Sequence, residues 1–174
     1  MKIFLALSFA CIGCGSAAKV AAPPAAPVPE SLKPPAGQSA VVTANAVGVQ
    51  VYECKAKKDD PSQLEWALKG PDAELFDAGG SKIGKHYVGP TWEANDGSKV
   101  VGEVKAKDPG PDPSAVPWLL LAAKSNEGTG VLSQVVNVQR LETVGGKAPD
   151  GACEAGKEAR VPYRAKYVFY NAAK

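Results

Sequence analysis

The chain has 174 residues, of which 20 are lysine or arginine and 18 are aspartate or glutamate, giving a formal net charge of +2. Nucleic-acid binding requires a clustered positive field, so this near balance predicts no nucleic-acid partner. His86 is the single histidine, which excludes zinc-protease motifs and copper sites that need two or more imidazoles. No P-loop or dinucleotide-binding glycine motif follows a predicted strand, so we expect no nucleotide cofactor.

The first residues have the features of an export signal. Residues 3–12 form an apolar run that is too short to cross a bilayer, which takes about 20 residues. Ile12-Gly13-Cys14 resembles the end of a bacterial lipobox, so we expect residues 1–14 to be a lipoprotein-like signal peptide with lipidation at Cys14. The alternative is cleavage after Ala17 or Ala18, which would release a soluble periplasmic or secreted protein.

Residues 15–37 are rich in proline and alanine. Each proline removes a backbone donor and fixes φ, so the segment cannot form a helix or a central strand. We expect a disordered, extended tether that holds the folded part, residues 38–174, clear of the lipid. The expected contact with the membrane is through the lipid anchor only.

Apolar residues alternate with period two through the folded part, as they do in strands that bury one face. Asp96-Gly97 between two such runs predicts a tight hairpin. Residues 118–124 could form a helical turn after Pro117, but the surrounding pattern favours a buried strand. About eight short antiparallel strands separated by turns predict an all-β domain, either a sandwich or a barrel. The clearest faces comprise Val47, Val49 and Val51, opposed by Gln50, Tyr52 and Cys54, and, near the C-terminus, Tyr163, Ala165, Tyr167 and Phe169.

Cys54 and Cys153 are the two cysteines that lie outside the signal region. In an oxidising compartment such a pair commonly forms a disulfide, which here would close a loop of 99 residues (153 minus 54). The alternative is a redox-active or metal-binding pair, although neither cysteine lies in a C-x-x-C motif or beside the histidine. We expect the disulfide, and no metal site.

Six residues are candidates for ligand binding: His86, Tyr87, Trp92, Glu93, Asp96 and Arg140. Glu93 and Asp96 flank a predicted hairpin near an aromatic residue, as two glycosidase carboxylates would, but they could also be an exposed strand residue and a turn acid. Trp92 is the tryptophan that we expect to be exposed for stacking on a flat ligand. Arg140 faces either solvent or a buried acid, for which Glu93 and Asp96 are the candidates.

Ordered motifs along the folded part resemble those of an uncharacterised exported family of bacteria and fungi, catalogued as domain of unknown function 3455. The resemblance covers about residues 48–170, and the family also has cysteines at the positions of Cys54 and Cys153. It implies a folded domain and agrees with the disulfide, but it implies no activity, because none is established for the family. The motifs are Gly48 to Cys54, Trp66, Gly70-Pro71, Ala73-Glu74-Leu75, Gly84 to Glu93, Asp96-Gly97-Ser98, Pro117 to Leu121, Val138-Gln139-Arg140, Thr143 to Gly146 and Val161-Pro162-Tyr163.

The sequence contains no recognisable catalytic constellation. We therefore expect a non-catalytic binding module of the cell envelope, whose partner is an unknown small molecule, glycan or envelope protein. One alternative is a carboxylate-dependent hydrolase or isomerase centred on His86, Glu93 and Asp96. The other alternative is a structural or stress-protective surface protein.

Overall fold

The computed structural model describes residues 26–173. The expected signal peptide, Cys14 and the alternative cleavage positions at Ala17 and Ala18 lie outside the described residues. Within residues 26–173, one short 3-10 helix, η1 (Glu30–Leu32), precedes eight strands. The strands are β1 (Gln38–Ala56), β2 (Leu64–Phe76), β3 (Lys82–Tyr87), β4 (Thr91–Ala94), β5 (Lys99–Asp108), β6 (Trp118–Glu127), β7 (Val135–Gly145) and β8 (Glu158–Ala172).

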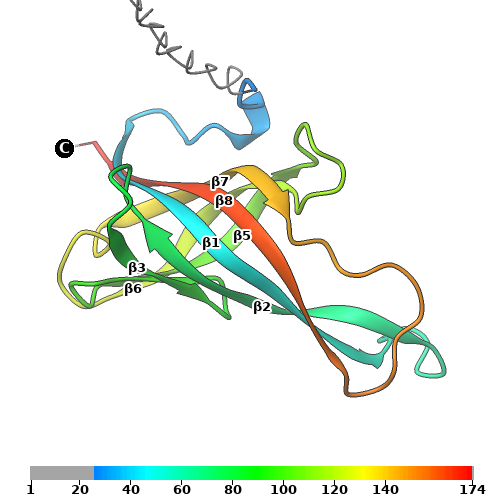
Figure 1. Ribbon diagram of the computed structural model, residues 1–174. Coiled ribbons are helices and arrows are strands. Elements are labelled where there is room, and N and C mark those ends of the chain that lie inside the picture. The colour runs from blue at the N-terminus through cyan, green and yellow to red at the C-terminus, as the bar shows by residue number, and fades with distance from the viewer. Residues whose placement is uncertain (1–25, 174) are drawn as a thin grey trace, which may run out of the picture.

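The eight strands form one closed antiparallel barrel in which each strand pairs with the next along the chain and β8 returns to β1. The all-β prediction is confirmed, and of the two predicted architectures the barrel is the one that forms. Figure 1 shows β1 and β8 side by side along the molecule, and they are longer than the short strands we expected, at 19 and 15 residues. They pair with each other along nearly their whole length, from Gln38 opposite Ala172 to Glu53 opposite Glu158.

Two local predictions are confirmed. Asp96-Gly97 forms the turn between β4 and β5, where the Ala94 amide donates to the Ser98 carbonyl at 2.9 Å and Gly97 adopts a φ of 85°. Residues 118–124 lie in strand β6 rather than in a helical turn.

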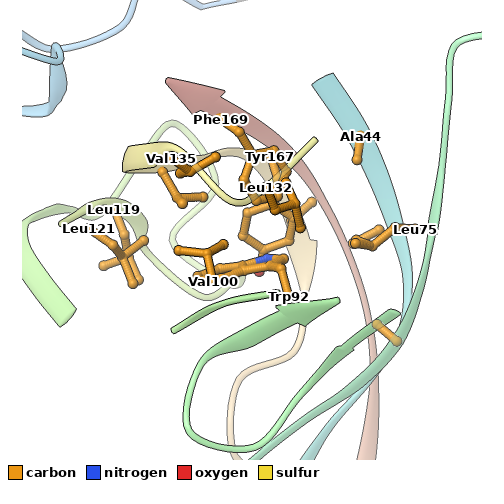
Figure 2. Packing of buried hydrophobic residues seen from close by; sticks show 14 of the residues in the cluster. Ala44, Leu75, Trp92, Val100, Leu119, Leu121, Leu132, Val135, Tyr167 and Phe169 are labelled. Carbon is orange, nitrogen blue, oxygen red and sulfur yellow. The ribbon is translucent and has the colours of Figure 1, made fainter. Parts of the chain in front are cut away.

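The barrel interior is filled by aromatic and aliphatic side chains from all the strands. Figure 2 shows the rings of Trp92 and Tyr167 meeting near the centre, with Leu119 and Leu121 to one side and Leu75 to the other. Of the two faces of β1, the inward one carries Ala44, Ala46 and Gln50, whereas Val47 on the outward face is 45% exposed. The inward face is therefore not uniformly apolar, and this matters for the site described below.

The predicted disulfide between Cys54 and Cys153 is confirmed, with Cα atoms 5.8 Å apart. It attaches the long β7–β8 connection to the end of β1. Two backbone hydrogen bonds reinforce this attachment, from the Cys54 amide to the Lys157 carbonyl at 2.8 Å and from the Gly156 amide to the Cys54 carbonyl at 2.9 Å. Among the described residues, no group of three or more histidine, cysteine, aspartate or glutamate side chains is arranged to hold a metal ion.

Residues 26–37 pack on the barrel, which corrects our expectation that the disordered tether extends to residue 37. Leu32 is fully buried against Trp118, Leu120 and Leu141, and the Gln139 side chain donates to the Leu32 carbonyl at 2.6 Å. Trp118 and Leu120 alternate with the inward-facing Leu119 and Leu121, so they lie on the outer face of β6 and would otherwise contact water. This apolar outer face explains why a proline-rich segment is ordered there. The rest of the expected tether, residues 15–25, lies outside the described residues.

No helix within residues 26–173 is long and apolar enough to span a membrane.

Candidate functional site: a cavity inside the barrel

The wall of the barrel is incomplete on one side because β3 and β4 are short. Strand β2 pairs with β3 only from Ala73 to Phe76, and β5 pairs with β4 only from Lys99 to Val101. Residues 68–71 of β2 and Val104 of β5 therefore border a gap in the wall that no strand fills. We call this gap, together with the turn at residues 88–90 that borders it, the side opening.

A cavity of about 270 Å³ leads from the side opening into the barrel. Leu68 and Val104, which border it on β2 and β5, are 56% and 49% exposed. Most of its surface is apolar, and the charged side chains that line it, Lys69 and Arg140, are both basic. The remaining lining residues are Gln50, Gly70, Pro71, His86, Gly89, Pro90, Trp92, Leu119, Leu121 and Tyr167.

His86 lies at the inner wall of the cavity. Its ring stacks on Trp92 with centroids 4.5 Å apart and planes within 5°. Its Nδ1 is 2.8 Å from the Thr91 carbonyl oxygen, which can only accept, so Nδ1 carries the proton and Nε2 is left as an acceptor. Burial lowers the pKa of His86 to about 3, opposed by the Thr91 hydrogen bond and assisted by the charge of Arg140. The imidazole is therefore neutral at physiological pH.

Trp92 lies in the core with 1% of its surface exposed, so the prediction that it is an exposed stacking residue is wrong. It pairs with His86 across β3 and β4, and residues paired on neighbouring strands share a face, which here is the inward one. Gly102 on β5 makes room for the indole, because a Cβ there would stand 2.9 Å from a carbon of the ring. The indole Nε1 is buried and has no hydrogen-bond partner.

Arg140 extends from β7 into the cavity and is half-buried. Its Nε donates to the Pro117 carbonyl at 3.0 Å, and its guanidinium also hydrogen-bonds to the Tyr167 hydroxyl. No carboxylate within residues 26–173 forms a salt bridge with it, so neither Glu93 nor Asp96 is the buried partner that we considered.

Tyrosine side chains surround the guanidinium of Arg140. The hydroxyls of Tyr163 and Tyr167 are 3.2 Å apart, and Tyr52 donates to the Gly146 carbonyl at 2.7 Å. Burial raises the pKa of Tyr167, and the charge of Arg140 together with hydrogen bonds from Tyr163 and Arg140 lowers it in part. Burial likewise raises the pKa of Tyr163. These phenols remain neutral, so they do not neutralise the arginine.

Gln50 is a site residue that sequence reasoning did not identify. It is 1% exposed on the inward face of β1, lines the cavity, and its Nε2 has no hydrogen-bond partner. Buried amides are normally hydrogen-bonded, so an unpaired one marks an exception that needs an explanation. The feature of the sequence that could have identified Gln50 is its position on the same strand face as Ala44, Ala46 and Tyr52.

Tyr87 and Glu93 lie on the outer face of the barrel, away from His86 and Trp92. The Tyr87 hydroxyl donates to a Glu93 oxygen at 2.8 Å, and Lys85 and Lys99 lie 3.4 and 3.9 Å from the same carboxylate group. The Tyr87 hydrogen bond, more than the two lysines, lowers the pKa of Glu93. This cluster is satisfied by its own contacts.

Asp96 serves the β4–β5 turn. Its carboxylate accepts from the Ser98 hydroxyl at 2.6 Å, the Ser98 amide at 2.9 Å and the Val131 amide at 2.8 Å, and the Ser98 hydroxyl is the largest cause of its lowered pKa. Of the six candidates, the structure thus brings together His86, Trp92 and Arg140. It does not bring His86, Glu93 and Asp96 together, because Glu93 points outward and Asp96 is held in the turn.

The described residues define a single-domain antiparallel barrel of eight strands with a ligand-sized interior cavity that carries one unpaired cation. The chain belongs to the family described as protein of unknown function (DUF3455), whose profile matches residues 35–171. Comparison with curated proteins and with solved structures found no match.

Proposed function

We propose that this protein is a non-catalytic binding module of the bacterial cell envelope, and that the barrel cavity holds a small molecule. The observation that carries the proposal is the cavity of about 270 Å³, in which Arg140 lies without a carboxylate partner in a mostly apolar lining. Ligand sites in proteins have this composition, with a few polar groups that fix the ligand in an apolar pocket. Eight-stranded barrels have an interior that side chains just fill or that holds one small ligand.

The chemistry of the cavity favours binding over catalysis. A hydrolase or isomerase of the carboxylate type requires an acid near the reacting atoms. None of the residues that line the cavity is an aspartate or a glutamate, and His86, which does line it, is neutral and held by Thr91.

Blocking the side opening tests ligand binding. A melting-temperature screen of small molecules, glycans and lipids against the purified, oxidised protein should give stabilising ligands, because a ligand at 100 times its Kd adds about 2.7 kcal/mol. Val104→Trp, at the opening, should abolish that stabilisation, whereas Val47→Trp, on a similarly exposed outer position of β1, should leave it unchanged. A screen without stabilising ligands would favour a structural role instead, and ligands that stabilise both variants equally would refute binding in the cavity.

We further propose that the protein is exported and anchored at Cys14. The disulfide supports an oxidising compartment outside the cytoplasm, and the lipobox-like sequence supports lipidation. Cys14→Ala should move the protein from the membrane fraction to the soluble fraction of the producing cells. An unchanged membrane fraction would refute lipidation and leave cavity binding untouched.

A further inference from the structure

The charged side chains that line the cavity are both positive. Lys69 is paired with Glu158, whereas Arg140 has no acidic partner among the described residues. An unpaired cation is costly to remove from water, and a bound group that brings negative charge would relieve that cost.

We infer that the ligand of this cavity, if it binds one as proposed above, is an aliphatic monocarboxylate whose carboxylate lies on Arg140. A carboxylate supplies two acceptor oxygens in one plane, which match the two terminal nitrogens of a guanidinium. The Nε of Arg140 donates to Pro117, and the terminal nitrogens meet a neutral tyrosine hydroxyl but no carboxylate among the described residues, so a ligand carboxylate would be their stronger partner.

A single negative charge fits better than two. Arg140 is the one basic residue of the cavity lining that has no carboxylate partner within the described residues. Lys69, the other basic residue of the lining, is 57% exposed and is paired with Glu158 at 3.1 Å. A dianion such as a phosphate monoester would therefore retain one uncompensated charge.

The apolar part of the ligand has a defined direction. Leu119 and Leu121 line the cavity wall, and Leu68 and Val104 line the side opening, where both are about half exposed. A hydrocarbon chain attached to a carboxylate at Arg140 would run along the leucines and cover these exposed side chains. Burying each methylene should strengthen binding about fourfold, until the chain emerges into solvent.

Three probes with the same eight-carbon chain and different head groups test this inference: octanoate, octanol and octylamine. Calorimetric titration of the purified, oxidised protein at about pH 7 should show octanoate binding about tenfold to a hundredfold more tightly than octanol, as expected for hydrogen bonds to a charged group. Octylamine should bind more weakly than octanol. If octanol or octylamine binds as tightly as octanoate, the carboxylate assignment is overturned while cavity binding stands.

Arginine variants locate the head group. Arg140→Met should reduce octanoate binding to the level of octanol, whereas Arg164→Met, an exposed arginine on the outer face of β8, should change neither. Arg140→Lys should give an intermediate loss, because the charge is kept and the paired geometry is not. Circular dichroism checks that the variants fold. If the Arg140 variants do not fold, the relative affinities of octanoate, octanol and octylamine for the unaltered protein still test the carboxylate assignment. Equal octanoate binding by Arg140→Met and the unaltered protein, or no octanoate binding by the unaltered protein, overturns the inference. The blocking variants described above then still decide whether the cavity binds another ligand.

Discussion

Mild acidification should destabilise this protein through His86. The pKa of the buried imidazole is lowered to about 3 from a value of 6.5. Below pH 6.5 the unfolded chain therefore binds a proton that the folded chain excludes, so stability is complete above pH 6.5 and falls as the pH drops toward 3. Among the groups packed against the ring, the positive Arg140 strengthens this effect, the uncharged Trp92 and Tyr167 leave it unchanged, and the Thr91 hydrogen bond weakens it, which the value of about 3 already includes.

The magnitude follows from the two pKa values of His86. Each unit of pKa corresponds to about 1.36 kcal/mol, and the full difference of about 3.5 (6.5 minus 3) corresponds to about 5 kcal/mol at strongly acidic pH. Between pH 7 and pH 5 the expected loss is about 2 kcal/mol. This interval lies above the range in which most carboxylates titrate, including Asp96 and Glu93, whose pKa values are lowered by their hydrogen bonds.

Urea denaturation of the oxidised protein at both pH values measures this loss. His86→Gln is the matched variant, because an amide nitrogen can replace the donor to the Thr91 carbonyl and does not titrate. The variant should be less stable than the unaltered protein at pH 7 but should lose much less on going to pH 5. The assignment of this pH dependence to His86 would be refuted if the free energy of unfolding of the unaltered protein were the same at pH 7 and pH 5. It would also be refuted if His86→Gln lost as much stability between these pH values as the unaltered protein.

Three further predictions concern stability. Replacing Cys54 and Cys153 together with serine should cost up to about 4.7 kcal/mol, the entropy of a loop of roughly 100 residues; unchanged thermal unfolding of the variant would contradict this. Leu32→Ala should cost about 2–4 kcal/mol in urea unfolding, because it leaves a cavity under the N-terminal segment; a change below about 0.5 kcal/mol would mean that the segment is not part of the fold. Gly102→Ala should cost about 1–3 kcal/mol and alter tryptophan fluorescence, because its methyl group would crowd Trp92; an unaffected spectrum and stability would show that the indole can move aside.

Much of the fold was accessible from sequence because its determinants are local. Side chains alternate across a strand, so the run from Tyr163 to Phe169 identifies one face of β8 without any knowledge of its neighbours. The Asp96-Gly97 turn requires a positive φ at its glycine, and that preference is also local. The two cysteines outside the signal region left one pairing within the domain once an oxidising compartment was inferred.

The candidate site was only partly accessible. His86 and Arg140 are candidates for ligand binding on sequence grounds, but nothing in their spacing indicates that they share a cavity. Glu93 is adjacent to Trp92 in sequence, and this suggested a common site, although neighbouring strand residues point to opposite faces. The ordered segment around Leu32 was missed because its prolines exclude helix and strand but do not exclude packing on an apolar surface.

The sequence by itself determined the strands, their turns and the disulfide, because these follow from the geometry of neighbouring residues and from the number of cysteines. Only the tertiary structure decided which face of each strand points inward and which polar groups meet there. That decision depends on barrel closure, in which Ala44 of β1 lies opposite Tyr167 of β8, and on the two short strands that leave the side opening. The same closure places Arg140 in a mostly apolar cavity without a carboxylate partner, where leaving a cation unpaired costs more than it does in solvent.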